Sequence, residues 1–418
     1  MLPLLALFAV LESCGQIVVD IEELENQQCF WEKEDKVLLL SSETDWLSTT
    51  RNFVLKESEL SGNSYLSFSK DYGKTWISNI NNVIGTINFV HWFSDGTCLI
   101  CTPNKCYWTS DYKTLNVSNI LDEDGSALII PVEEWHFNVP NSQSNELALI
   151  DGKEYLLWGD YCGEANYSSV WSTKDCGHTI QRVLKNNVSS ITNVEGNEVP
   201  FVITHVHKVT FDNLHNCYWI TTGDYGSGCK LIRADIIDGD WHFTQVLEGP
   251  KAKFVGVMVD EEYIYFVTDY TNPGLHNGLL RCSLEQLGNI DNYEYLWQVP
   301  NEDVTASAKK ICLSNIFKDD AGNIVITGDD GQFNVLWYAY RNYDFKEIHL
   351  ISNIIERFSV HYFVGPNFNG DLIAPLTTYG WSGGRDRMGL NRCKRVLIST
   401  DFRKNGAVDF GKNMSGIF

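Results

Sequence analysis

Residues 205–224, HVHKVTFDNLHNCYWITTGD, contain two apolar stretches joined by the polar turn DNLHN. Short stretches rich in β-branched and aromatic residues on either side of such a turn predict two antiparallel strands. The same order of strand, turn and second strand returns at a spacing of about fifty residues. Further copies are ELALIDGKEYLLWGD (146–160), FVGVMVDEEYIYFVTD (254–269), LSNIFKDDAGNIVITGD (313–329) and HYFVGPNFNGDLIAPL (361–376).

Two more units bring the count to about seven. They are FVHWFSDGTCLICTPNKCYWTSD (89–111) and an opening unit that ends in YLSFSKDYGKTW (65–76). The composition agrees with strands, because 13 Trp, 19 Tyr and 21 Phe accompany only four Met. Four-stranded units repeated around an axis close into a ring without long exposed edges. We therefore predict an all-β fold, a β-propeller of four-stranded antiparallel blades, with seven blades or, as the alternative, six, in a single domain over residues 16–418.

Residues 1–15 have the features of a short secretory signal peptide. The apolar run LPLLALFAV (2–10) precedes Ser13 and Gly15, which are small residues suited to a cleavage point. The run is too short to span a bilayer, and sequons at Asn116, Asn166, Asn187 and Asn413 agree with export. We expect a secreted or cell-surface protein. The alternative is a cytoplasmic protein in which this run is a buried strand.

The net charge of −22 limits the classes of partner. Such a field repels nucleic acid and anionic membrane surfaces, so we expect neither as a partner, and no membrane insertion. The segment GGRDRMGLNRCKR (383–395) is an exception, because its basic residues outnumber its single Asp. Twelve cysteines form no clear metal-binding pattern. Cys101 and Cys106 flank a four-residue turn, which places them opposite each other in a hairpin as a disulfide or as buried thiols.

The stretch SKDYGKTW (69–76) repeats as TKDCGHTI (173–180), and TSDYKTL (109–115) and STDFRKNG (399–406) are weaker copies. In this pattern the Asp can bond the amides of its own turn and the Gly supplies a positive φ. The pattern resembles the Asp box, or BNR repeat, of sialidase-like β-propellers. The resemblance implies a fold rather than an activity. It also implies that these turns join the third and fourth strands, on the face opposite the binding site.

The propeller geometry predicts which residues meet at the mouth of the central channel. The first strand of each unit starts there and the second ends there, so His205 and His207 should lie beside Asp224. Alternation along a strand directs both imidazoles to one side, where they could hold a substrate or, with Asp224, a divalent metal. Asp160, Asp269 and Asp329 end their second strands in the same way. By register, Glu146 and His361 match His207, and Lys253 matches His205.

The loops on this face carry aromatic and charged side chains that suit sugars, which stack on rings and need hydrogen-bond partners. The predicted substrate-binding residues are Glu164, Tyr225, Tyr270, Trp381, Arg385, Arg387 and Trp135. The predicted catalytic residues are His205, His207, Asp224, Asp269 and His361.

Two chemistries on an oligo- or polysaccharide fit these residues, and neither requires a cofactor. Hydrolysis would use two carboxylates from Asp224, Asp269 and Glu164. β-Elimination on a uronate would use a His or Tyr base, with Arg385 or Arg387 to neutralise the sugar carboxylate. The arginine pattern of a typical sialidase is absent. We therefore predict a monomeric, carbohydrate-cleaving propeller, and the alternative is a noncatalytic propeller that binds glycan or protein.

Overall fold

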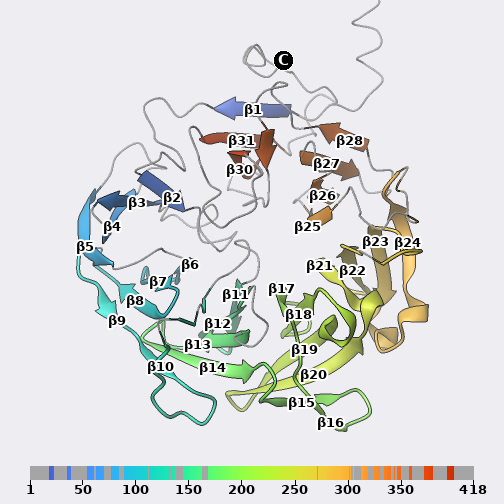
Figure 1. Cartoon of the computed structure of the whole chain (residues 1–418), viewed down its shortest axis with the longest axis horizontal. Helices are drawn as coiled ribbons and strands as arrows, with labels where there is room; N and C mark the ends of the chain where they lie inside the picture. Colours follow the sequence, from blue (N-terminus) through green and yellow to red (C-terminus); the bar gives the residue numbers. More distant parts are fainter. Residues whose placement is uncertain are drawn as a thin grey trace, which may run out of the picture.

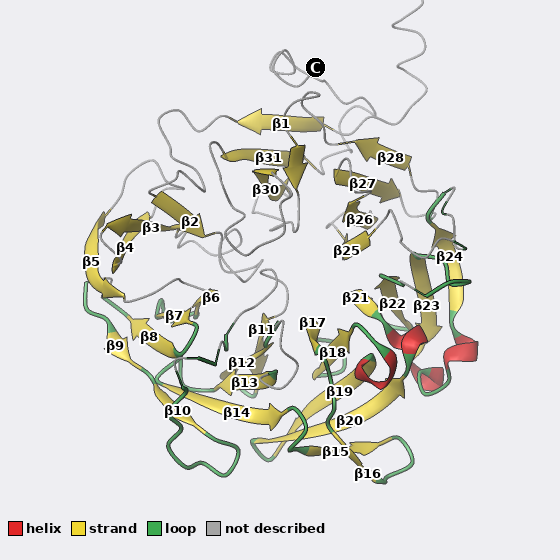
Figure 2. Ribbon diagram, viewed as in Figure 1, coloured by secondary structure: helices red, strands yellow, loops and turns green. Residues whose placement is uncertain are grey.

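The computed structural model describes residues 89–137, 145–161 and 168–300, apart from residues 112, 132, 135 and 271. Outside these ranges it describes residues 302, 305 and 343 and the backbone of the strands at 18–22, 35–38, 54–60, 63–69, 77–83, 312–318, 324–329, 334–339, 346–349, 357–359, 371–379 and 393–399. The described elements are strands and four 3-10 helices of three residues each, so the all-β prediction is confirmed (Figure 2). The helices are η2 (Gly226–Gly228), η3 (Pro250–Ala252), η4 (Leu284–Gln286) and η5 (Ile290–Asn292).

The described strands form seven sheets, and these surround a central axis as a β-propeller (Figure 1). Four sheets have four strands in chain order. These are β2 (Asp35–Leu38), β3 (Val54–Leu60), β4 (Asn63–Ser69) and β5 (Ile77–Val83); β6 (Phe89–Trp92), β7 (Cys98–Thr102), β8 (Lys105–Thr109) and β9 (Asn116–Val117); β21 (Phe254–Val259), β22 (Tyr263–Thr268), β23 (Gly278–Ser283) and β24 (Glu294–Gln298); and β25 (Cys312–Lys318), β26 (Ile324–Asp329), β27 (Asn334–Ala339) and β28 (Lys346–His349).

Two further sheets carry extra outer strands that the sequence did not predict. One consists of β11 (Asn145–Ile150), β12 (Lys153–Gly159), β13 (Ser169–Thr173) and β14 (Thr179–Lys185), and β10 (Asn119–Leu121) pairs in parallel with β14. The other consists of β17 (His205–Asp212), β18 (Cys217–Gly223), β19 (Lys230–Ile237) and β20 (Asp240–Glu248), extended by β15 (Ser190–Asn193) and β16 (Glu198–Pro200). The four-stranded prediction therefore holds for the inner part of these sheets only.

The last sheet joins distant parts of the chain. It contains β29 (Arg357–Ser359), β30 (Asp371–Tyr379) and β31 (Cys393–Ser399), and its outer strand is β1 (Val18–Glu22). β1 runs antiparallel to β31, with Val18 opposite Ser399. Backbone pairing between the two ends of the described chain thus completes this sheet (Figure 1).

Apolar side chains fill the spaces between neighbouring sheets. Trp158, Trp171 and Phe137 are fully buried in one cluster, and Phe254 stacks on Phe266 in another. Burying aromatic rings of this size is worth roughly 2–3 kcal/mol each. The sheets approach closely: a Cβ on Gly159 would lie 2.3 Å from Val206 of the next sheet. This packing fixes the position of β17, which carries the candidate site.

The turn at residues 173–180 has the local structure that its sequence predicts. Asp175 accepts hydrogen bonds from the Thr173 hydroxyl at 3.0 Å and the Thr179 amide at 2.8 Å, and Gly177 has a φ of +83°. The turn joins β13 to β14, the third and fourth strands of its unit. Asp111 makes equivalent bonds to the amides of Lys113 and Thr114 between β8 and β9. The first copy, residues 69–76, lies outside the described side chains.

Cys101 and Cys106 are directly opposite each other in β7 and β8, as the hairpin predicts. Their sulfur atoms are 2.7 Å apart and both side chains are fully buried as thiols.

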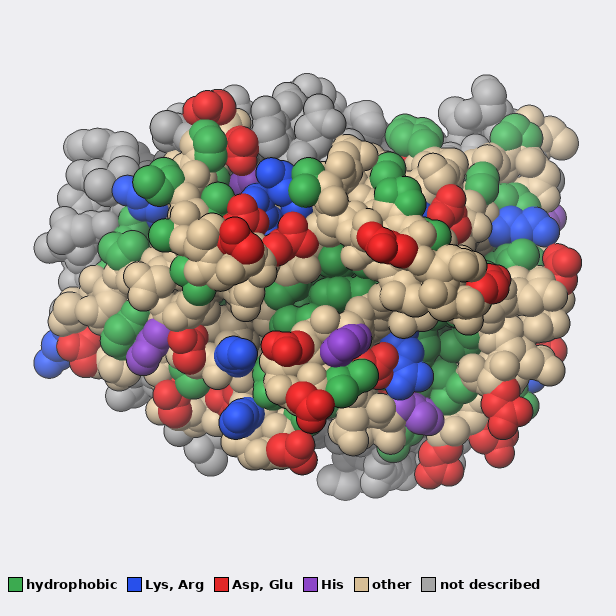
Figure 3. Space-filling model, turned by 90° about the horizontal axis from the view of Figure 1, so that it is seen from below, with side chains coloured by type: hydrophobic (Ala, Val, Ile, Leu, Met, Phe, Trp, Pro, Cys, Tyr) green, Lys and Arg blue, Asp and Glu red, His purple; other side chains and the backbone are tan. Residues whose placement is uncertain are grey.

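Within the described part of the chain, we find no helix with the length and hydropathy needed to cross a membrane. Seen from below, acidic side chains are scattered over the surface among polar and apolar ones, as the net charge of −22 leads one to expect (Figure 3).

Candidate active site

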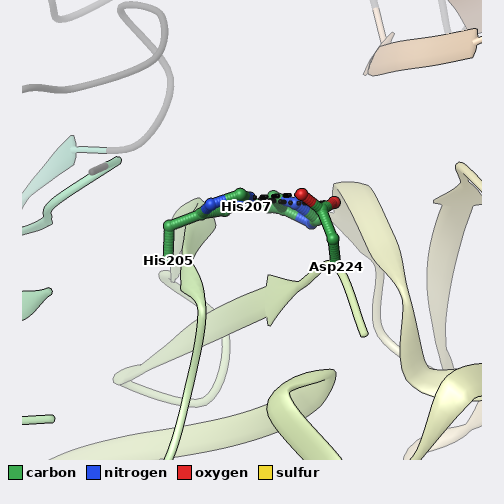
Figure 4. Close-up of side chains that lie close together, drawn as sticks. All are labelled: His205, His207 and Asp224. Carbon is green, nitrogen blue, oxygen red and sulfur yellow. Dashed lines mark hydrogen bonds and ion pairs between the residues drawn. The ribbon is translucent and has the colours of Figure 1, made fainter. Parts of the chain in front are cut away.

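Two histidines and an aspartate meet where β17 begins and β18 ends. His205 and His207 lie at the start of β17, and Asp224 directly follows β18. His205 pairs with Gly223 in the ladder, so the three side chains come from adjacent backbone (Figure 4). His205 and His207 are only 5% and 7% exposed. The structure therefore brings together the His-x-His pair and the Asp as the sequence predicts.

A β-bulge at His207 contributes to this arrangement. Val206 pairs with Thr222 and Lys208 with Thr221, so the register of the ladder shifts by one residue at His207. An extra residue of this kind bends the strand and redirects a side chain. The same register shift occurs at Val255 in β21 and at Ser314 in β25. Three consecutive sheets thus share this feature at the start of their innermost strand, and simple alternation does not reveal it.

The imidazole nitrogens and the carboxylate face one another at short distances. The Nε2 atoms of His205 and His207 are 3.0 Å apart. His205 Nε2 lies 3.2 Å from Asp224 Oδ2, and His207 Nε2 lies 3.3 Å from Asp224 Oδ1. His207 Nδ1 lies 3.1 Å from the carbonyl oxygen of Phe254. Because a carbonyl only accepts, this nitrogen carries the proton, and a neutral His207 presents its lone pair on Nε2 toward the cluster.

Gly223 makes room for the His207 ring. A Cβ on this residue would lie 2.2 Å from His207 Cε1. No real Cβ contact is that short, so any side chain at this position would displace the imidazole. The Gly that precedes Asp224 in the sequence is therefore part of the cluster's geometry.

Lys253 links the cluster to a second carboxylate. It directly precedes β21, and its ammonium lies 3.1 Å from both Asp224 and Asp269, which directly follows β22. The lysine side chain is 5% exposed, whereas the Asp side chains are 26% and 18% exposed. The second oxygen of Asp269 is buried and has no hydrogen-bond partner among the described residues. The predicted register match of Lys253 with His205 thus places a cation at the same mouth.

The protonation of these groups follows from burial and from their neighbours. Burial lowers the pKa of His205, and Asp224 offsets this only in part. Burial alone would raise the pKa of Asp224, but its interactions with His205 and His207 outweigh it and hold that pKa far below its ordinary value. Burial alone would lower the pKa of Lys253, but Asp269 and Asp224 outweigh it and raise that pKa. Asp224 is therefore a carboxylate and Lys253 an ammonium at neutral pH.

Tyrosine rings border the cluster. Tyr161 packs on His205 with 4.0 Å between ring centroids and is 37% exposed. The sequence did not single out Tyr161, although it directly follows Asp160, the residue after β12. Tyr225 directly follows Asp224 and is 75% exposed, in agreement with a place on the surface. Tyr270, in contrast, is 2% exposed, and its hydroxyl donates to the carbonyl of Lys251. Its predicted role as a substrate platform was wrong, because the ring belongs to the core.

Asp160 occupies the position that corresponds to Asp224 in the preceding sheet but has a different environment. It is fully buried and accepts hydrogen bonds from the Phe137 amide and the Trp171 indole. It also lies 2.7 Å from His136 Nδ1. The recurring Asp at the end of the second strand is structural here. Glu164, Trp135, His361, Trp381, Arg385 and Arg387 lie outside the described residues, as do the side chains of Glu146 and Asp329.

Comparisons with known proteins support the fold. No family model and no curated protein matches the chain. A selenomethionine-substituted virginiamycin B lyase from Staphylococcus aureus has a similar structure, with a TM-score of 0.51 and 12% identity over 92% of this chain and 100% of that chain. The WD40 β-propeller domain of Doa1 gives a TM-score of 0.47 and 12% identity over 93% of this chain and 98% of its own. At such identities the likeness to the lyase concerns the fold alone.

Proposed function

We propose that this protein is an enzyme that cleaves a uronate-containing oligo- or polysaccharide by β-elimination at the channel mouth. The observation that carries the proposal is the convergence of two imidazoles, two carboxylates and an ammonium on adjacent strand ends, beside an exposed tyrosine. Partly buried ionisable groups with such mutual contacts commonly take part in acid–base catalysis.

β-Elimination uses groups of these kinds. A base takes the proton from the carbon next to the uronate carboxylate, and its electron pair forms a carbon–carbon double bond as the bond to the glycosidic oxygen breaks. The leaving oxygen takes up a proton, so no water is consumed. A positive charge at the carboxylate makes the first proton easier to remove. The base is an imidazole of the cluster or the hydroxyl of Tyr161. The positive charge is that of the Lys253 ammonium.

Hydrolysis fits the described residues less well. A glycosidase needs one carboxyl group that donates a proton and a second, separate carboxylate. Asp224 faces His205, His207 and Lys253, and the Lys253 ammonium donates to it. Asp269 faces the same ammonium. Both carboxylates therefore act as acceptors within one ion cluster, which does not suit the role of acid.

Other observations support a sugar as the substrate. Tyr161 and Tyr225 offer exposed rings beside polar groups, which is the usual composition of a sugar site. The basic segment 383–395 would attract an anionic chain in an otherwise acidic protein. Virginiamycin B lyase, which has a similar fold, is by its name a lyase, so the scaffold is compatible with this class of reaction as an analogy of fold. Export by residues 1–15 would bring the protein to extracellular polysaccharides.

The test is incubation with a panel of uronate and neutral oligosaccharides, monitored by ultraviolet absorbance for unsaturated products and by a reducing-end assay. We expect absorbance from a uronate substrate. His207→Ala should lower the rate by about 100-fold or more, whereas His242→Ala, an exposed histidine on β20, should not. Reducing ends without absorbance would indicate hydrolysis. Binding without any product would favour the noncatalytic alternative.

A further inference from the structure

We propose that His205, His207 and Asp224 bind one divalent transition-metal ion at the channel mouth. The ion's role in catalysis rests on the function proposed above, but its presence does not. The described part of the chain contains one group of three or more His, Cys, Asp or Glu residues whose ligand atoms all lie close enough to share an ion, and it is this group.

One ligand atom from each of the three residues lies within 4.8 Å of the other two, which is close enough for a shared ion. Nitrogen and oxygen ligands lie about 2.0–2.1 Å from Zn²⁺, so the edge of the coordination tetrahedron is about 3.3 Å. The two Nε2 atoms are 3.0 Å apart, and each faces a different oxygen of Asp224: His205 lies 3.2 Å from Oδ2 and His207 lies 3.3 Å from Oδ1. Little rearrangement is needed for the three side chains to surround an ion. Three protein ligands would leave a further coordination position open toward the mouth.

The surroundings prepare the side chains for this role. Metal-binding histidines usually donate their second ring N–H to a carbonyl or carboxylate, which fixes the ring and directs the other nitrogen to the ion. The contact of His207 Nδ1 with the Phe254 carbonyl is of this kind. Gly223 leaves the space that the ring occupies. The bulge at His207 brings its Nε2 to within 3.0 Å of His205 Nε2.

The local charge also favours a cation. When both imidazoles are neutral, the carboxylates of Asp224 and Asp269 and the ammonium of Lys253 leave the cluster with one net negative charge. Lys253 retains Asp269 as a partner when Asp224 binds the ion, and Asp224 Oδ2 faces His205 rather than Lys253. Two imidazoles and one carboxylate suit Zn²⁺, Co²⁺ or Mn²⁺ better than Ca²⁺ or Mg²⁺, which prefer oxygen ligands.

A bound ion would determine which group serves as the base and which neutralises the uronate carboxylate. It occupies the lone pairs of both imidazoles, and its charge neutralises the carboxylate of the uronate. The base is then Tyr161, the exposed ring that packs on His205. Tyr161→Phe should therefore retain the metal and lose turnover.

The experiment uses the full chain, stripped with a chelator and reloaded with Zn²⁺ or Co²⁺. Metal content is measured by mass spectrometry after gel filtration, and the visible spectrum of the Co²⁺ form reports the coordination geometry. We expect about one ion per chain. His205→Ala and His207→Ala should lower the affinity by at least 100-fold, and Gly223→Ala, which removes no ligand, by about tenfold or more. His242→Ala should bind as the wild type does.

The outcomes separate the two proposals. If the wild type binds no stoichiometric ion, or if the His207→Ala and His242→Ala variants bind equally, the metal site is wrong, even where elimination activity is found. If the ion binds at the cluster but no uronate is cleaved, the metal site stands and the proposed function is wrong. A Tyr161→Phe variant that retains both metal and turnover would overturn the assignment of the base.

Discussion

Lys253 has a carboxylate on either side of its ammonium, and it is the more buried partner in both ion pairs. Replacing it with Met would leave Asp224 and Asp269 without their shared counter-charge. Breaking a buried pair costs about 3–5 kcal/mol, and the partial exposure of the two acids reduces this to about 2 kcal/mol. Urea denaturation should therefore show Lys253→Met to be less stable than the wild type by about that amount.

Lys251 provides the matched control, because its side chain is 56% exposed and lies 3.9 Å from Asp291. Lys251→Met should change the free energy of unfolding by less than about 0.5 kcal/mol. Equal effects of the two substitutions would mean that the ion cluster contributes no more to stability than a surface pair.

His136 makes the stability depend on pH. It is buried between Asp160, 2.7 Å from Nδ1, and Glu134, 3.1 Å from Nε2. Burial alone would lower the pKa of His136, but the two carboxylates outweigh it and raise the pKa above 6.5. A raised folded-state pKa gives a stabilisation that is complete below the unfolded-state pKa and is lost as pH rises through the folded-state value.

The free energy of unfolding should accordingly fall as the pH is raised from 6 to 9 in the wild type. His136→Gln should remove this part of the change, and the difference between the two profiles isolates His136 from other titrating groups. Parallel profiles would show that the histidine keeps one protonation state over this range.

For single residues, the sequence predicts which side chains lie together better than it predicts how buried or hydrogen-bonded each of them is. His205, His207 and Asp224 come together because strand alternation and strand ends are local properties of the chain. The sequence offers no means of telling Asp224, at the mouth, from Asp160, which is buried under Phe137 and Trp171. That difference depends on His136 and Phe137, which contact Asp160 and lie outside the repeated unit in sequence.

At the scale of elements, the turn at 173–180 is a stabilising unit separate from the site. Thr173 pairs with Leu156, whereas Val170 pairs with Gly159, so the turn lies at the end of β12 and β13 that is remote from Asp160. Asp175→Ala removes two hydrogen bonds and should lower stability by about 1 kcal/mol with no change in metal content or turnover. Thermal unfolding and the two site assays would reveal any coupling between the ends of the sheet.

The first two strands of the repeated units are predicted from their hairpins, whereas the outer strands β10, β15 and β16 are missed, although β15 and β16 also pair as a hairpin. β17 and β18 are adjacent in sequence and their turn is evident. β10 and β15, in contrast, pair in parallel with strands further along the chain, with Asn119 opposite Thr179 and Thr192 opposite Thr244. They are three and four residues long, too short for a periodic pattern to reveal them.

At the scale of the whole molecule, the repeat predicts a ring of sheets. The repeat does not predict the strand that completes the last sheet. β1 lies outside the repeated units, and only its pairing with β31 shows its place. Deleting residues 1–22 would leave β31 as an exposed edge. We expect a lower Tm and more aggregation in gel filtration, whereas deletion of residues 1–17, which spares β1, should change neither.

The bulge shared by β17, β21 and β25 bears on how such a protein acquires new chemistry. The backbone feature is common to three sheets, but the residue at its centre is His207, Val255 or Ser314. Duplication of an ancestral unit would copy this backbone feature. A reactive group can then arise in any sheet by one codon change, without remodelling the scaffold, so ancestry and activity can diverge quickly in proteins of this architecture.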